Sequence, residues 1–191
     1  FNFTDEIETL EEANRLFEVV KQVAAVDLHP DTIPNIAMGY VFEDLVRRFN
    51  EQANEEAGDH FTPREVIKLM VHLLFTYDDF VYTPGKVIRI YDPACGSGGM
   101  LSESEKLIAD PEDGLNPGAN LELFGQEYNP ESYAICGSDL MIKGEDVKNI
   151  VFGNTLGTGK AKEGFVDGDG HPDKKFHYML ANPPFGVEWK P

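Results

Sequence analysis

The amino-acid sequence predicts an α/β fold in which a doubly wound parallel sheet follows a helical N-terminal segment. Two observations favour this fold. From residue 87 onward, short apolar segments alternate with segments of helical periodicity, an order typical of parallel sheets with helices on both faces. Before residue 60, apolar residues recur at helical spacing. The 191 residues, with a hydrophobic content of 41%, suit one domain with a real core and a small helical appendage.

Three helices are predicted ahead of the sheet. The first covers residues 4–25, with Thr4 or Asp5 as its N-terminal cap, and the second covers residues 34–56 and is closed by Gly58. The third covers residues 64–75, and Pro63 suits its first turn, where the missing N–H is not needed. We therefore expect a domain boundary after residue 58.

Four strands are predicted, at residues 87–91, 121–127, 149–154 and 176–180. A helix ending near residue 108 and a second at 130–144 join the first three strands, and the Pro- and Gly-rich residues 110–119 form a loop. The segment 156–175 is rich in Gly, Asp and Lys and is predicted to be a flexible loop. Its stretch "DGDGHPD" lacks the Gly and Glu that a calcium loop needs at its sixth and twelfth positions, so we expect no metal site.

Polar side chains stand at the end of every predicted strand. Asp92 follows the first strand, Glu127 ends the second, Asn154 ends the third, and the "NPPF" motif at 182–185 follows the fourth. In an open parallel sheet, ligands bind beyond the carboxyl ends of the strands. The sequence therefore predicts one ligand site to which all four strands contribute.

The loop "DPACGSGG" after the first strand indicates what kind of ligand this site takes. Its glycines let the backbone turn tightly, but neither the GxxxxGK[ST] nor the GxGxxG spacing of phosphate-binding loops is present. Asp92 would also repel a pyrophosphate. A carboxylate there suits a ligand with a cationic end, such as S-adenosylmethionine, and Glu127 is placed to accept hydrogen bonds from ribose hydroxyls.

The "NPPF" motif has the features of a rigid clamp for a flat, NH₂-bearing ring. Asn182 offers a side-chain carbonyl, and Pro183 offers a backbone carbonyl whose direction is restricted by Pro184. Both can accept hydrogen bonds from an exocyclic amine, which makes its nitrogen a better nucleophile. Phe185 can stack on a base rotated out of a nucleic-acid helix. We therefore predict that residues 182–185 are catalytic.

Charge and composition limit the possible partners and compartment. The net charge of −18 opposes independent binding to a phosphate backbone, which depends on Lys and Arg. No apolar run approaches the length of about 20 residues that a membrane span needs. Cys95 and Cys136 form no disulfide framework or metal pattern, so we expect a reduced, cytoplasmic setting. Because the chain has no initiator Met, we expect a piece of a larger protein.

The series "HFTPREVIKLMV", "DPACGSGGM", "GQEYNP", "GNTL" and "NPPFG" resembles the modification subunits of type I restriction–modification systems, which are N6-adenine DNA methyltransferases. The resemblance covers about residues 35–191. It implies a Rossmann-like class I S-adenosylmethionine-dependent methyltransferase fold, truncated after the fourth strand and preceded by N-terminal helices. On this basis, residues 1–58 are an N-terminal helical segment and residues 59–191 are the N-terminal part of the catalytic domain, whose C-terminal part is missing.

The resemblance also implies roles for individual residues. Residues 60–64 would lie along the methionine end of the cofactor, with Thr62 as donor to its carboxylate. Asp92 and residues 94–99 would wrap the methionine moiety, Glu127 would hold the ribose, and Asn154 would lie near the adenine amine. The full set of implied cofactor-binding residues is His60, Phe61, Thr62, Pro63, Arg64, Asp92, Ala94, Cys95, Gly96, Ser97, Gly98, Gly99, Glu127 and Asn154. The implied catalytic residues are Asn182, Pro183, Pro184 and Phe185, and no metal is implied. Cys95 lacks the Pro-Cys context of a C5-cytosine nucleophile.

The implied partners are a DNA specificity subunit, a restriction (endonuclease/translocase) subunit and double-stranded DNA held through the complex, with no membrane. The chain alone is expected to be inactive. An alternative stays open, because methyltransferases that act on a protein glutamine amide or on a guanine amine in RNA share the clamp. The "FTPREV" motif, the N-terminal helices and Phe185 in place of Tyr favour DNA.

Overall fold

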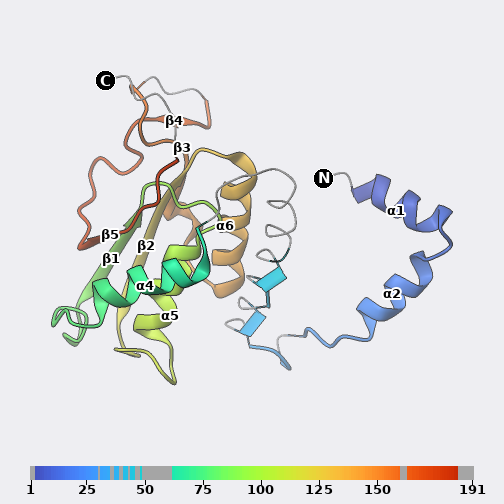
Figure 1. Cartoon of the computed structure of the whole chain (residues 1–191), viewed down its shortest axis with the longest axis horizontal. Coiled ribbons are helices and arrows are strands. Elements are labelled where there is room, and N and C mark those ends of the chain that lie inside the picture. The colour runs from blue at the N-terminus through green and yellow to red at the C-terminus, as the bar shows by residue number, and fades with distance from the viewer. Residues whose placement is uncertain are drawn as a thin grey trace.

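The computed structural model describes residues 3–29, 31–34, 37–38, 41–42, 44–45, 48, 62–159 and 163–184. Figure 1 shows an α/β unit formed by the later part of the chain and, to one side, two N-terminal helices. The elements are α1 (Phe3–Glu12), α2 (Leu16–Ala24), α4 (Arg64–Phe75), β1 (Val87–Asp92), α5 (Gly99–Ala109), β2 (Asn120–Glu127), α6 (Pro130–Lys143), a 3₁₀ turn (Val147–Asn149), β3 (Ile150–Asn154), β4 (Val166–Asp167) and β5 (Tyr178–Met179).

The predicted single helix over residues 4–25 is wrong, because two helices, α1 and α2, occupy this stretch. Asn14 between them has a left-handed backbone (φ 55°), which Asn adopts more readily than most residues. The N–H of Arg15 donates to the backbone carbonyl of Leu10 at 2.8 Å, and the N–H of Asn14 donates to the backbone carbonyl of Glu11 at 2.9 Å. These two bonds form a Schellman motif that ends α1.

The predicted caps of the first helix are also wrong, because Thr4 and Asp5 lie inside α1. Of the predicted second helix, the described residues 37, 38, 41, 42, 44, 45 and 48 are helical, whereas Gly58 lies outside the described residues. The predicted third helix is confirmed as α4, although Pro63 stands just before it and not in its first turn.

All strand pairs are parallel, and the strand order is β4-β3-β2-β1-β5. The first three predicted strands are therefore confirmed, with small shifts at their ends. The fourth is present but shorter than predicted, and β4 was not predicted. Because β5 lies on the other side of β1 from β2, the strand order reverses between β1 and β5. Such a reversal is where open α/β sheets bind ligands.

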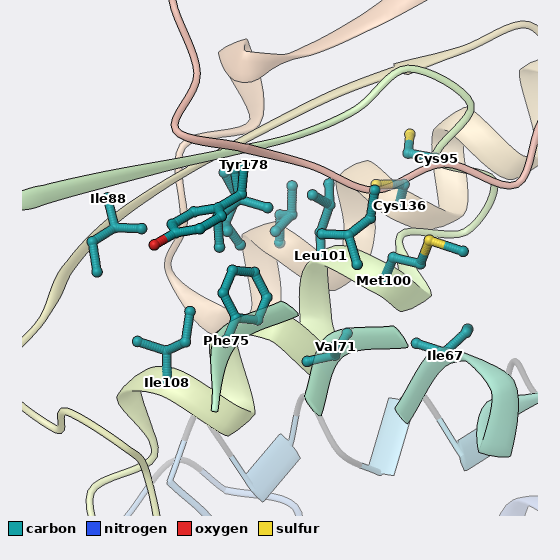
Figure 2. Close-up of a cluster of buried hydrophobic side chains, with 14 of the residues drawn as sticks. Ile67, Val71, Phe75, Ile88, Cys95, Met100, Leu101, Ile108, Cys136 and Tyr178 are labelled. Carbon is teal, nitrogen blue, oxygen red and sulfur yellow. The ribbon is translucent and has the colours of Figure 1, made fainter. Parts of the chain in front are cut away.

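The helices α4, α5 and α6 pack on one face of the sheet. Ile67, Val71 and Phe75 of α4 share one buried cluster with α5, α6 and alternate residues of the strands, including Ile88 and Ile90. Figure 2 shows the α4 side chains directed toward this cluster. Each fully buried side chain of this size stabilises the fold by about 1.5–3 kcal/mol.

The prediction of helices on both faces is wrong for the described part of the chain. The crossovers β1–α5–β2 and β2–α6–β3 each move to the next strand on the same side of the sheet. Because such crossovers are right-handed, both helices lie on the same face. The connection from β3 back past β1 to β5 must then cross the opposite face. Residues 155–177 form this connection, and they contain the short strand β4 but no described helix.

This connection is fastened to the sheet, so the prediction of a flexible loop is wrong for its described residues from 163 onward. His171 is buried, with Nε2 3.2 Å from the carbonyl oxygen of Gly125, and its ring meets the rings of Tyr91 and Phe124 edge to face. The buried amide of Gln126 accepts from the N–H of Gly170 at 2.9 Å and donates to the carbonyl of Gly168 at 2.8 Å. No motif or periodicity in the sequence indicated His171.

Candidate active site

The four strand-end side chains lie at one edge of the sheet. Asp92, Glu127 and Asn154 are the last residues of β1, β2 and β3, and Asn182 follows β5. These strands are neighbours in the order β3-β2-β1-β5, and all are parallel. The predicted juxtaposition at their carboxyl ends is therefore present.

The glycine-rich loop after β1 depends on two left-handed residues, Gly96 (φ 55°) and Gly98 (φ 88°). A Cβ atom on Gly98 would lie 2.8 Å from Sγ of Cys136, so this glycine lets the loop pack against α6. A Cβ atom on Gly96 would meet nothing within 4 Å, so the loop faces open space there. The first glycine can thus approach a ligand, whereas the second fits the loop onto the core.

Glu127 joins the end of β2 to this loop. Its Oε2 accepts from the backbone N–H of Gly96 at 2.7 Å, and its Oε1 accepts from the N–H of Asn129 at 2.7 Å. The N–H of Cys95 also donates to the carbonyl of Gln126 at 3.0 Å. These bonds hold the carboxylate of Glu127 against the backbone of the loop.

Asp92 is 2% exposed and accepts from the N–H of Ala94 at 3.0 Å. Burial raises the pKa of Asp92 to about 7, opposed by that hydrogen bond and reinforced by the negative charge of Glu127. Within the described ranges, no lysine or arginine forms an ion pair with it. A buried carboxyl group without a cationic partner is suited to a ligand that carries positive charge.

Cys95 contributes its backbone to the loop and its side chain to the core. The side chain is 5% exposed and belongs to the buried cluster that also contains Cys136. A hydrogen bond with Cys136, together with burial, raises the pKa of the Cys95 thiol. A protonated, buried thiol is a poor nucleophile. This agrees with the interpretation that Cys95 does not attack a base.

The residues before α4 reach the same edge. Thr62 accepts a hydrogen bond from Nδ2 of Asn182, with 2.7 Å between nitrogen and oxygen. Pro63 has an extended backbone and accepts through its carbonyl from the N–H groups of Val66 and Ile67, which begins the helix. The guanidinium of Arg64 lies 3.8 Å from the carboxylate of Glu103 on α5. The predicted site residues His60, Phe61 and Phe185 lie outside the described residues.

The end of β3 shapes the turn beside the loop. Oδ1 of Asn154 accepts from the N–H of Leu156 at 3.2 Å, and the hydroxyl of Thr155 donates to the carbonyl of Pro93 at 2.5 Å. Tyr128, directly after Glu127, is 66% exposed, and its ring meets that of Phe165 edge to face with centroids 5.8 Å apart. Tyr128 was not among the predicted site residues, although an aromatic residue directly after a strand-end acid could have indicated it.

In the part of the chain that the structure describes, no three His, Cys, Asp or Glu side chains are grouped to hold a metal ion. None of the described helices is long and apolar enough to cross a membrane.

The comparisons with known proteins agree with the motifs. A family model described as N-6 DNA Methylase matches residues 35–191. The type I restriction enzyme HindI methylase subunit of Haemophilus influenzae is 30% identical over 153 residues, which cover 80% of this chain and 30% of that protein. The MjaVIII methylase subunit of Methanocaldococcus jannaschii is 35% identical over 155 residues, which cover 79% and 23%.

A solved structure shows the same fold. It is the type I restriction-modification system methyltransferase subunit from Streptococcus thermophilus, with a TM-score of 0.62 at 23% identity, covering 93% of this chain and 33% of that chain. The predicted Rossmann-like methyltransferase fold is therefore confirmed, although helices cover only one face of the sheet in the described residues. The chain spans less than a third of the length of the two curated relatives. Because the family model covers most of the sequence, the chain belongs to the N-6 DNA methylase family, as its motifs predicted.

Proposed function

We propose that this chain carries the cofactor-binding and catalytic residues of a site-specific N6-adenine DNA methyltransferase, the modification subunit of a type I restriction–modification complex. One observation carries the proposal: a buried acid, a glycine loop tied to a second acid, and the clamp asparagine lie at the carboxyl ends of adjacent parallel strands. Residues 1–58 would form an N-terminal helical segment, and residues 59–191 would be the N-terminal part of the catalytic domain.

The residues fit S-adenosylmethionine as the cofactor. Asp92 is buried, has no cationic partner among the described residues and would attract the ammonium group. Gly96 leaves the outer side of the loop open, and Glu127 stands beside it to accept from ribose hydroxyls. The exposed ring of Tyr128 would offer a stacking surface to the adenine. When bound, S-adenosylmethionine would supply an electrophilic methyl group.

The clamp residues would act on the target amine. Oδ1 of Asn182 and the carbonyl of Pro183 would accept its two N–H groups, which draws the lone pair of the nitrogen out of the ring. The two carbonyls stabilise the positive charge that develops on nitrogen, so their effect is larger in the transition state than in the ground state. Phe185 would stack on the flipped base. We do not propose the protein-amide or RNA alternative, because the matching family is one of DNA methylases.

Other subunits would have to hold the DNA. A net charge of −18 offers few cations to displace counterions from a phosphate backbone. We therefore assign target recognition to a DNA specificity subunit and cleavage to a restriction subunit. Such a complex would work in the cytoplasm of a bacterium or archaeon, where the two free cysteines of this chain would stay reduced.

The test is methyl transfer by the full-length subunit together with its specificity subunit. Tritium from labelled S-adenosylmethionine should enter duplex DNA, and digestion of the product should yield N6-methyladenine. Asn182→Ala should remove most of the incorporation, whereas Asn120→Ala, at the end of β2 opposite Glu127, should leave it unchanged. Label recovered in protein or RNA and absent from DNA would refute the proposal.

A further inference from the structure

The side chains of Thr62 and Asn182 meet although 120 positions separate them in the chain. Nδ2 of Asn182 donates to Oγ1 of Thr62, with 2.7 Å between the two atoms. Thr62 lies just before α4, Asn182 lies after β5, and both residues are partly buried. This hydrogen bond therefore links the segment before α4 directly to the clamp.

A second contact holds the far ends of the same two segments. Phe75, the last residue of α4, meets the ring of Tyr178, the first residue of β5, edge to face with centroids 4.9 Å apart. Figure 2 shows this pair within the buried cluster. The two segments thus run in opposite directions, with Phe75 and Tyr178 at one end and Thr62 and Asn182 at the other. A side chain carried by packed elements is held more precisely than one on a free loop.

Which end of the Asn182 amide faces the substrate decides whether the clamp can work. Oδ1 can only accept a hydrogen bond, and Nδ2 can only donate. The terminal torsion of Asn is broad and roughly two-fold, so the residue does not select one orientation by itself. Pro183 and Pro184 have no N–H that could fix Oδ1 locally. Only Oδ1 can accept from an amine, so another residue has to hold Nδ2 away from the substrate.

We propose that Thr62 is the positioning residue that orients the Asn182 amide. Its Oγ1 accepts from Nδ2, and Oδ1 is thereby left to accept from the substrate amine. A hydroxyl that accepts in this way still has its own proton to donate. The same Thr62 hydroxyl can then donate to the cofactor's carboxylate, so cofactor binding favours the orientation that the clamp needs. The identity of the substrate rests on the proposed function, but the orientation of the amide does not.

NMR of the 191-residue chain tests the orientation without any reaction. The Asn182 side-chain amide signals are identified by their loss in Asn182→Ala. In Thr62→Val these signals should move upfield and exchange with water about fivefold faster or more, as expected when a hydrogen bond is lost. Thr62→Ser should restore them. Thr83→Val, which removes a hydroxyl bonded to the carbonyl of Asp79, is the matched control.

Unchanged Asn182 amide signals in Thr62→Val would overturn the positioning role. Backbone spectra of each variant show whether the fold is intact, and Thr62→Ala replaces the valine variant if that variant does not fold.

Kinetics of the full-length subunit with its partners separate positioning from simple cofactor binding. At saturating S-adenosylmethionine, Thr62→Val should lower kcat about tenfold or more, while Thr62→Ser stays within about threefold of the wild type. A raised KM for the cofactor with unchanged kcat would reduce Thr62 to a cofactor contact and overturn the inference. If the wild-type complex methylates no adenine in DNA, the proposed function fails, and the NMR result still decides the positioning role.

Discussion

The two halves of the candidate site are built in different ways. The loop half consists of residues 92–99 with Glu127, and the clamp half consists of Thr62 with residues 182–184. Within the loop half, the hydrogen bond between Glu127 and Gly96 joins residues 31 positions apart on consecutive strand–loop units. The clamp half is held by the bond between Asn182 and Thr62, across 120 positions.

This difference indicates how each half can fail. The loop half is held by backbone conformation and by several bonds to its own backbone, so a substitution there acts through strain or through lost ligand contacts. The clamp half offers exposed prolines and one oriented amide, and it contributes little to the core. Substitutions in the clamp should therefore change turnover, whereas substitutions in the loop should change stability and cofactor affinity.

The largest effect is expected from Asn182→Ala in the full-length subunit with its partners. Turnover should fall by about 10²–10³-fold, the usual loss when a group that stabilises developing charge is removed. The affinity for S-adenosylmethionine should stay close to that of the wild type. Single-turnover methyl transfer and calorimetry measure the two quantities. Lost cofactor affinity with an unchanged turnover rate would show that Asn182 belongs to the loop half.

Gly98→Ala should lower the free energy of unfolding by about 2–4 kcal/mol, because a left-handed alanine is strained and its Cβ would collide with Cys136. Gly96→Ala is the matched control. Its Cβ would meet no atom, so only the strain of a left-handed alanine, about 1–2 kcal/mol, should lower the free energy of unfolding. Urea unfolding of the 191-residue chain measures both. Equal losses in the two variants would contradict the packing of the loop on α6.

Asp92→Asn and Glu127→Gln should each weaken the binding of S-adenosylmethionine by about 1–3 kcal/mol, the cost of a lost charged hydrogen bond. Neither substitution should disturb the clamp, because the hydrogen bond between Thr62 and Asn182 involves neither Asp92 nor Glu127. Calorimetric titration gives the affinities, with Glu122→Gln on the middle of β2 as the control. Affinities like that of the wild type in both variants would defeat this assignment of the loop half.

The last comparison concerns pH, where the effect of each single pH unit is small. Burial raises the pKa of Asp92 from 3.8 to about 7, so the folded chain binds more protons than the unfolded chain between these values. The free energy of unfolding should therefore fall as pH rises through this range. A cationic ligand favours the ionised carboxyl, so cofactor affinity should fall by up to about tenfold for each pH unit below 7. Asp92→Asn should flatten both profiles, and an unchanged slope in that variant would exclude Asp92 as the titrating group.

Much of the fold could be predicted because it depends on local patterns. The β-branched run at 87–91 and the helical spacing at 64–75 gave β1 and α4 close to their observed ends. Patterns of this kind failed at Asn14, where one residue in a left-handed conformation divides a continuous helical periodicity. They also failed for β4, because a strand of two residues is defined by its neighbour β3 and not by its own sequence.

The sequence by itself determined which residue types follow each strand, because each motif is one contiguous stretch. It also determined that these residues share one edge of the sheet, because parallel strands all end at the same edge. Only the tertiary structure decided that Asn182 meets Thr62 and that His171 fastens a crossover to the face of the sheet opposite α4, α5 and α6. These contacts depend on the handedness of the crossovers and on the packing of α4 against β5. Neither leaves a periodic trace in the sequence, because the partners come together only after the chain has folded back on itself.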